Sequence, residues 1–412
     1  MHLNTGDTAW LLASAALVLF MTPGLALFYG GMVNSRNVLT IMMQNFIAIA
    51  VITVTWILFG YSFAFNKSVL GGFIGLPSLS LGLSLNPVPA GLHLAVPAQA
   101  YLAFELMFAI ITGALITGAV AERMNFLAYV LFIVLWSIVI YCPIAHWAFS
   151  PEGWLNSRGM LDFAGGTVVE INSGFSALGL LIAVGPRLKW PKELNKPHSI
   201  PISLAGAGII WFGWFGFNAG SAIDANASAA VAFLNTELAA ATGLLGWIIF
   251  ERFKQGYATT LGAASGAIAG MVAVTPAAGY VEPYASLLIG LAAGVLCALF
   301  VNLKHRFKLD DSLDVLGVHG IGGIIGTLLV GFFATTVVYP AGTNGLFIKG
   351  SLHLLIIQIL GVICTCCYAF LMSFIIAKLI QLFVPLRVSK EVELSGLDLA
   401  LHAESAYFSR EG

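Results

Sequence analysis

Long apolar runs recur along almost the whole chain, and their length constrains the fold more than any other feature. A helix needs about 20 mainly apolar residues to cross the hydrocarbon core of a bilayer. Eleven segments reach this length, at about 8–31, 38–65, 99–121, 126–148, 163–184, 199–219, 228–250, 258–275, 285–303, 315–338 and 351–384. Charged residues make up only 9% of the 412 positions. The sequence therefore predicts an all-α polytopic membrane protein with eleven transmembrane helices.

Positively charged residues are unevenly distributed between the connecting loops. One set of alternate loops contains most of them, and the other set contains only Lys67, Arg158 and Lys349. The basic set is Arg36, Arg123, Arg187, Lys189, Lys192, Lys196, Arg252, Lys254, Lys304, Arg306 and Lys308. Because cytoplasmic loops are enriched in Lys and Arg, we expect an inner or plasma membrane protein with its N-terminus outside and its C-terminus in the cytoplasm. The net charge of -1 argues against nucleic acid as a partner.

The chain divides into a transmembrane domain at 1–384 and a cytoplasmic tail at 385–412, which is too short to bury a core of its own. A short internal sequence similarity relates Ala26–Gly31, at the end of span one, to Phe215–Gly220, at the end of span six. It predicts two five-helix repeats, at about 8–184 and 199–338, followed by a long eleventh helix at 351–384. Since five is odd, the second repeat enters the membrane from the opposite side, which places a site at the interface of inverted repeats.

Two titratable residues occupy corresponding places in predicted spans of the two halves. Glu170 lies in the middle of the segment Asp162–Gly174, and His319 lies in the corresponding late segment Asp314–Gly326. Ionisable groups at membrane depth are costly and usually mark a pathway for an ion or a proton. A histidine taken alone is more often a helix-packing residue, whereas a carboxyl group in hydrocarbon already favours function. Their matched positions predict a shared central site.

No cofactor, metal site or enzymatic centre is predicted. The cysteines lie in apolar runs without metal-ligand spacing, and they are Cys142, Cys297, Cys364, Cys366 and Cys367. The predicted spans also lack a combination of nucleophile, base and orienting group. An intramembrane enzyme is therefore the least favoured function.

Five motifs resemble those of a known family. They are Phe104–Ala109, Gly118–Arg123, Asp162–Thr167, Gly213–Ser221 and Gly317–Gly320. In this order they resemble the Amt/Mep/Rh ammonium transporter family, and the likeness covers nearly the whole chain. The resemblance implies a homotrimer in the lipid bilayer, in which each subunit has its own narrow apolar pore for ammonium or ammonia.

The resemblance assigns the outer part of the pore to three positions. Phe108 and Ser221 match residues that bind the cation in an outer cage, and Phe108 and Phe217 match two rings that gate the pore.

The remaining cage position departs from the family pattern. Phe149 stands where a tryptophan is usual, and its ring attracts cations more weakly. Trp147 and Trp154 are alternatives for the same role.

The centre of the pore also departs from the family pattern. His319 matches one of two facing histidines, and Glu170 replaces the other. Moving NH4+ intact through an apolar tube would desolvate a full charge, whereas NH3 crosses at low cost if its proton is carried separately. A carboxylate and an imidazole within hydrogen-bond reach can relay that proton.

Three further acidic residues lie at motif positions. Asp162 and Asp314 precede spans five and ten, and we expect both to be structural caps of the helices that follow. Glu105 stands where the family usually has Gln. Three alternatives remain open for it: it is protonated, it pairs with a neighbour, or it adds attraction for the cation.

The tail matches the family's ending at Gly396–Asp398, His402, Glu404 and Ala406–Tyr407, except that Ala403 replaces a glycine. The resemblance implies that the tail contacts a neighbouring subunit and can be regulated by a PII-type signalling protein. Alanine is a poorer choice than glycine if this position requires a positive φ angle.

These expectations combine into one functional hypothesis. The protein binds NH4+ at the outer cage, deprotonates it and conducts NH3, while Glu170 and His319 relay the proton and make uptake electrogenic. Two alternatives stay open, a passive NH3 or CO2 gas channel and an ammonium sensor that signals through the tail.

Overall fold

The computed structural model describes residues 3–192 and 196–407, so 1–2, 193–195 and the end of the predicted tail, 408–412, lie outside the described residues. The fold is almost entirely helical, and the π-helical and 3-10 turns are labelled η. In chain order the elements are α1 (Thr5–Met32), α2 (Val38–Thr55), η1 (Trp56–Gly60), α3 (Tyr61–Phe65), β1 (Ser68–Val69), β2 (Ile74–Gly75), α4 (Leu79–Leu83), α5 (Ala98–Leu115), η2 (Ile116–Val120), α6 (Phe126–Trp136), η3 (Ser137–Tyr141), α7 (Cys142–Phe149), η4 (Asn156–Arg158), η5 (Gly166–Ile171), α8 (Asn172–Val184), α9 (Ile200–Gly220), α10 (Ala227–Gln255), α11 (Thr260–Val274), α12 (Pro283–Leu303), η6 (Leu316–Gly320), α13 (Ile321–Phe333), η7 (Leu346–Ile348), α14 (Leu352–Gln381), α15 (Lys390–Ser395) and α16 (Leu397–His402).

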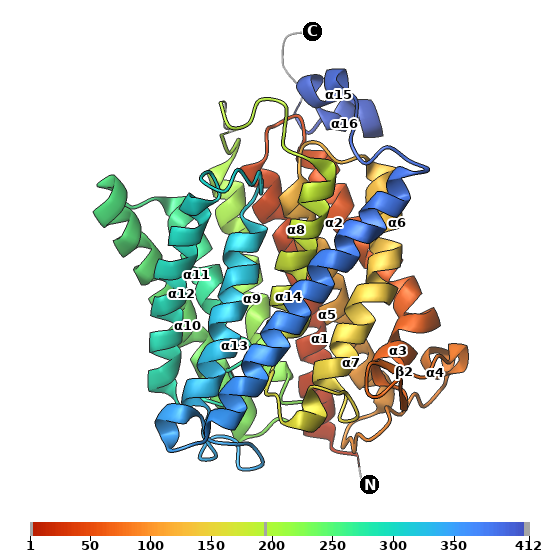
Figure 1. Ribbon diagram of the computed structural model, residues 1–412, viewed down its shortest axis with the longest axis vertical. Helices are drawn as coiled ribbons and strands as arrows, with labels where there is room; N and C mark the ends of the chain where they lie inside the picture. The colour runs from red at the N-terminus through yellow and green to blue at the C-terminus, as the bar shows by residue number, and fades with distance from the viewer. Residues whose placement is uncertain (1–2, 193–195, 408–412) are drawn as a thin grey trace.

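The helices confirm the predicted polytopic architecture. Within the described residues, ten segments are long and apolar enough to cross a membrane, and they are Thr5–Met32, Val38–Phe65, Ala98–Val120, Phe126–Phe149, Gly166–Val184, Ile200–Gly220, Ala227–Gln255, Pro283–Leu303, Leu316–Phe333 and Leu352–Gln381. The shorter apolar helix α11 accounts for the remaining predicted span. The N-terminal end of α1 and the tail helices α15 and α16 lie on opposite faces, as an odd number of spans requires (Figure 1).

Spans five and ten are built to the same plan. Both begin with a π-helical turn, η5 and η6, that continues into an α-helix. Glu170 in η5 and His319 in η6 are 149 positions apart. The same offset separates Asp162 from Asp311 and Gly165 from Asp314. Gly165 and Asp314 both have positive φ angles, at 104° and 63° respectively. This common register is what a structural repeat produces, and because the spans alternate in direction the two copies are inverted.

Glycines allow spans five and ten to cross in direct backbone contact. A Cβ atom at Gly174 would collide with the Cα atom of Gly320. At the equivalent place in the other repeat, a Cβ atom at Gly323 would lie 2.8 Å from the Cβ atom of Glu170. Small residues let membrane helices approach closely where lipid supplies no hydrophobic drive between them. The crossing therefore sets the separation between the side chains that these two spans carry.

The eleventh span covers the outside of this crossing. The long helix α14 runs obliquely across the bundle and packs against α8, α13 and α6 (Figure 1). Beyond it the chain turns into α15 and α16, which lie against the face where α1 ends and α2 begins.

Candidate functional site

The side chains of Glu170 and His319 meet at the centre of the bundle. Nδ1 of His319 lies 2.7 Å from Oε2 of Glu170, which is a hydrogen bond whichever group carries the proton. Glu170 is 1% exposed and His319 is 5% exposed. A carboxyl group and an imidazole in this contact can share and exchange one proton without needing water at that step.

The pair borders a cavity that is otherwise apolar. The cavity is narrow, and its walls come from α1, α5, η5, α9, α11 and η6. Trp214 also lines the cavity, but its indole N–H donates to Oγ1 of Thr275 at 3.0 Å. Glu170 and His319 are therefore the titratable groups that face this cavity among the described residues.

Two stacked phenylalanine rings close one end of the cavity. The ring centroids of Phe108 on α5 and Phe217 on α9 are 4.3 Å apart with an interplanar angle of 25°. Phe217 also lines the cavity, and both rings are 1% exposed. Phe104, one turn before Phe108, contacts it edge-on at 4.9 Å. Anything that enters the cavity from this end has to displace the two stacked rings.

The second predicted cage ring, Phe149, also contacts Phe108. The Phe149 ring lies 6.4 Å from that of Phe108, at 83° to it. Ser221 lies at the end of α9, where its hydroxyl donates to the backbone oxygen of Phe217 at 2.8 Å. That hydrogen bond caps the helix and leaves the lone pairs of the hydroxyl free to accept.

The two alternative tryptophans are engaged with other groups. The indole N–H of Trp147 donates to the backbone oxygen of Phe73, beside the hairpin β1–β2, at 2.8 Å. The guanidinium of Arg158 lies over the ring of Trp154 at 5.4 Å. Within the described chain, Phe149 contacts the ring of Phe108, and neither Trp147 nor Trp154 does.

Asp162 accepts a cluster of hydrogen bonds at the start of span five. Its carboxylate accepts from the amides of Gly165, Gly166 and Thr167 at 3.0, 2.6 and 2.9 Å, and also from the hydroxyl of Thr167. These are the amides that a helix start leaves without intrahelical partners. The arrangement is that of a helix cap, and it fixes the turn that carries Glu170.

The prediction for Asp314 is corrected by the structure. At the start of span ten it is Asp311 that accepts from the amide of Leu316, at 2.8 Å. Asp314 instead forms an ion pair with Lys304. The reason is the repeat register, because Asp311 occupies the position of Asp162, whereas Asp314 occupies the position of Gly165 and adopts its left-handed backbone conformation.

The cluster of Lys304, Asp311 and Asp314 places two carboxyl groups beside one lysine. Burial, together with the nearby charge of Asp314, raises the pKa of Asp311 to about 6. Burial alone would lower the pKa of Lys304, but Asp314 and Asp311 more than offset this and raise it above its ordinary value. One lysine thus balances two carboxyl groups incompletely.

The tail is docked on the same face by specific hydrogen bonds. Asp398 accepts from the amides of Leu39 and Thr40 at 3.0 and 2.8 Å and from the hydroxyl of Thr40 at 2.8 Å, which caps α2. The amide of Leu397 donates to Oδ1 of Asn37 at 2.8 Å. The expected contact of the tail with a neighbouring subunit stays a prediction.

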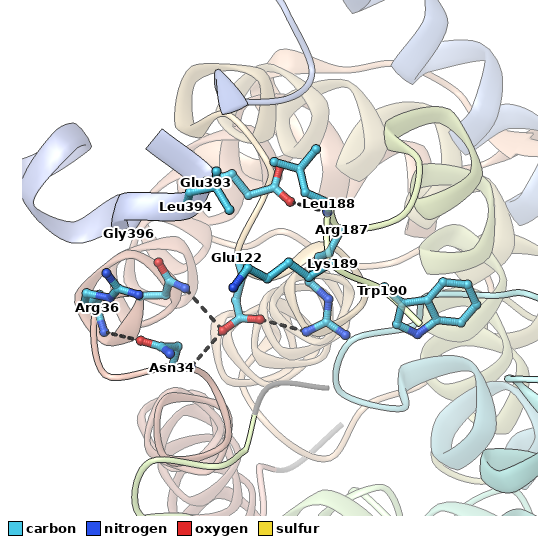
Figure 2. Close-up of a pocket in the computed structure, with 11 residues that line it drawn as sticks. Asn34, Arg36, Glu122, Arg187, Leu188, Lys189, Trp190, Glu393, Leu394 and Gly396 are labelled. Carbon is cyan, nitrogen blue, oxygen red and sulfur yellow. Dashed lines mark hydrogen bonds and ion pairs between the residues drawn. The ribbon is translucent and has the colours of Figure 1, made fainter. Parts of the chain in front are cut away.

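A polar pocket separates the tail from the loops beneath it (Figure 2). On one side, Glu122 accepts from the amide of Asn34 at 2.8 Å and pairs with Arg187 at 2.7 Å. On the other, Glu393 of the tail accepts from the amide of Leu188 at 2.8 Å.

Arg187 also pairs with Asp310 at 2.7 Å. Burial acts to raise the pKa of Asp310, but the Arg187 hydrogen bond and charge outweigh it and hold this pKa below its ordinary value. The Asp310 carboxylate therefore stays charged at neutral pH and anchors Arg187.

Position 403 does adopt the conformation that favours glycine. Ala403 follows α16 with φ 56° and ψ 29°, in the left-handed region. Alanine is therefore strained here, as expected for a residue that replaces a glycine of the family's ending.

Arg123, predicted only as one of the basic loop residues and as the end of the motif Gly118–Arg123, is fully buried. Its guanidinium donates to the backbone oxygens of Gly185 and Asp310 at 2.8 Å each and to Oγ of Ser312 at 2.7 Å. Burial lowers the pKa of Arg123 to about 10, which leaves it charged at neutral pH. Its position at the end of a loop gave no signal that it joins three segments distant in sequence.

The chain is similar to known proteins over nearly its full length. The profile of the Ammonium Transporter Family matches residues 9–407. The ammonium transporter of Bacillus subtilis is 46% identical over 408 residues, which cover 98% of this chain and 99% of that protein. The crystal structure of Saccharomyces cerevisiae Mep2 has a TM-score of 0.86 at 33% identity, covering 93% of this chain and 89% of that one. A structure described as a Sensor Amt Protein has a TM-score of 0.86 at 30% identity, covering 96% and 98%.

Proposed function

The chain belongs to the ammonium transporter family, whose members are membrane transporters and not enzymes, and from that premise we propose that it takes up ammonium by separating NH3 from its proton. The contact between Glu170 and His319 in an apolar cavity carries this proposal. An isolated ion transferred from water into an apolar medium loses hydration worth tens of kcal/mol. A neutral NH3 molecule avoids most of that cost, so the pore favours NH3 and needs a separate carrier for the proton.

Capture of the cation takes place outside the stacked rings. The faces of Phe108 and Phe149 attract a cation electrostatically, with about 0.5–1 kcal/mol at an exposed site and about 2 kcal/mol or more once it is desolvated. The free lone pairs of Ser221 can accept an N–H of the ammonium ion. Ammonium thus concentrates at the mouth before it loses its proton.

Passage of NH3 requires the rings of Phe108 and Phe217 to swing aside. The neutral molecule then enters the apolar cavity beside the Glu170–His319 pair. The pair takes up the proton that ammonium gives up, because each group has an accessible neutral and charged form, and it releases that proton on the far side. Each cycle moves one positive charge together with one NH3, so uptake is electrogenic.

The assembly and orientation follow the family and the charge distribution. We place three subunits in an inner or plasma membrane, each with its own pore. The N-terminus lies outside, because the face that carries the tail also carries the basic loops around Arg187 and Lys304. We assign a PII-type signalling partner to that face, and the pocket in Figure 2 and the docked tail support this assignment.

An ammonium sensor is the second candidate, and one observation favours it. The fold matches a structure described as a Sensor Amt Protein across almost the whole chain. Removing 385–412 separates the two functions: ammonium uptake persists in a transporter and is altered only through regulation, whereas a sensor loses its output with the tail.

Current recording on proteoliposomes tests the proposed transport directly. An inward ammonium gradient should produce a current that scales with the amount of protein and is absent from protein-free liposomes. Uptake of ammonia without any current would instead establish a passive gas channel. The recording should be repeated at several pH values, because proton relay predicts a pH dependence that gas conduction lacks.

A further inference from the structure

The carboxyl group of Glu105 lies inside the protein beside the outer rings, and the conduction path described above does not use it. Its side chain is 7% exposed. On α5 it follows Phe104, which contacts Phe108 at 4.9 Å. Glu105 precedes Phe108 by three positions, and residues with this spacing on a helix have Cβ atoms about 5–6 Å apart. Glu105 is therefore an immediate neighbour of the ring that forms the proposed cation cage.

Three tyrosines surround the carboxyl group, and no base does so among the described residues. Tyr101, one turn earlier on α5, lies close enough to interact with the Glu105 side chain. Tyr61 on α3 and Tyr141 on η3 lie close enough to interact with its charge, and the thiol of Cys142 lies next to Tyr141. Within the described chain no ion pair includes Glu105. A neighbour that pairs with Glu105 is therefore not a base among the described residues, and pairing with a tyrosine stays compatible with the alternatives that the sequence left open.

Two polar atoms of this cluster are buried without a hydrogen-bond partner in the part of the chain that the structure describes. They are Oε2 of Glu105 and the hydroxyl oxygen of Tyr141. A buried polar group without a partner costs free energy, and an unpaired buried carboxylate costs so much that the group usually binds a proton instead. The empty state of the pore therefore favours a protonated Glu105.

The backbone around the cluster is irregular in a way that is common at functional sites. Two π-helical turns, η1 and η3, flank it. Trp56 at the start of η1 contacts the rings of Tyr61 and Tyr141 at 5.9 and 6.0 Å. Single π-helical turns inside α-helices are rare and frequently mark functional positions. Tyr141 of η3, which interacts with the charge of Glu105, is thus linked to η1 through its contact with Trp56.

We propose that Glu105 is a proton-binding site coupled to the outer cage, which holds a proton while the cage is empty and releases it when an ammonium ion binds. The inference rests on the proposed function in one respect, namely that the cation binds beside Phe108. A bound cation supplies the positive charge that an ionised Glu105 otherwise lacks. The released proton leaves the carboxyl oxygen towards the outer loop, where the hydroxyl of Tyr61 already donates to the backbone oxygen of Pro87 at 2.9 Å.

The coupling has a definite sign and size. Because ionised Glu105 attracts the cation, the concentration of NH4+ that half-saturates transport falls as the outer pH rises and the carboxyl group loses its proton. Two unit charges on the order of 10 Å apart, at an effective dielectric constant of about 20, change the affinity by roughly tenfold. Glu105→Gln preserves the shape of the side chain but cannot ionise, so this dependence disappears in the variant.

Infrared difference spectroscopy on the purified protein in liposomes tests the proposal without requiring transport. Addition of ammonium chloride should remove the carbonyl band of a protonated carboxyl group in the wild type, whereas sodium chloride at equal ionic strength should leave it. The same band change should be missing in Glu105→Gln and present in Glu170→Gln. Half-saturating NH4+ concentrations, corrected for the fraction present as NH3, should shift roughly tenfold with pH in the wild type and stay constant in Glu105→Gln.

Two results would overturn the proposal: a wild type with no ammonium-dependent carboxyl band, or a band change that persists in Glu105→Gln. Failure of the proposed function looks different. In that case Glu170→Gln carries the same ammonium current as the wild type, while the infrared signal of Glu105 is unaffected.

Discussion

Glu170 and His319 hydrogen-bond to each other across 2.7 Å from π-helical turns that begin two oppositely directed spans. The contact depends on backbone packing, since Gly174 meets Gly320 and Gly323 meets Glu170 where the spans cross. A carboxyl group and an imidazole are thus placed in register by glycines that never touch the substrate. The geometry of the relay is consequently sensitive to substitutions several residues away from it.

Gly174→Ala should separate the two spans. The added Cβ atom would collide with Gly320, so the helices must shift, and overpacking of this kind costs about 1–3 kcal/mol. We expect a lower melting temperature in detergent and a smaller ammonium current. Gly208→Ala is the matched control, because nothing lies within 4 Å of a Cβ atom at that position. Equal melting temperatures and currents for the two variants would show that the glycine crossing does not set the geometry.

Ala403→Gly should strengthen the docking of the tail. Residue 403 has a φ angle of 56°, and an L-residue in the left-handed region costs roughly 1–2 kcal/mol relative to glycine. Hydrogen exchange at the amides of α16 should therefore slow down in the variant. Ala400→Gly makes the same substitution inside α16 and should speed exchange up, because glycine is about 1 kcal/mol worse than alanine within a helix. Faster exchange in both variants would contradict the strain assigned to Ala403.

Asp311→Asn should change how stability depends on pH. Burial and the charge of Asp314 raise the pKa of Asp311 from its ordinary value of 3.8 to about 6 in the folded protein. Because this pKa is raised, the contribution to stability is fully present below pH 3.8 and is lost as the pH rises through about 6. The loss amounts to about 3 kcal/mol, at 1.36 kcal/mol per pKa unit.

Asparagine can still accept from the amide of Leu316 but has no charge to bury. Thermal unfolding between pH 4 and 8 should therefore show a steeper loss of stability in the wild type than in Asp311→Asn. Parallel curves for the two proteins would exclude this carboxyl group as the source of the pH dependence.

The spans could be predicted from the sequence because hydropathy alone determines what a bilayer accepts. The predicted segment 38–65, for example, corresponds to the helical segment Val38–Phe65. The π-helical turn η1 within it could not be predicted, since one extra residue per turn leaves the composition of an apolar run unchanged. The same holds for η5 and η6, which aim Glu170 and His319 at each other.

The candidate site was predictable where a residue type is rare at membrane depth and not where it is common. Glu170 stands out in an apolar run, whereas Phe149 is one of 29 phenylalanines and was singled out only through the family motif. Asp311 and Asp314 are equally good helix caps by type. Only their register against Asp162 and Gly165 distinguishes them, and that register becomes visible once Glu170 and His319 are seen to be paired.

Ammonium-driven current in proteoliposomes that contain Glu170→Gln tests the central claim most directly. Glutamine can still hydrogen-bond to His319 but cannot take up or give back a proton. We predict that the current falls by roughly 100-fold or more, the size expected when a positioned proton-transfer group is lost. Glu237→Gln makes the same change on an exposed side chain that accepts from Trp211, and it should leave the current intact. A Glu170→Gln current equal to that of Glu237→Gln would contradict proton relay through this pair.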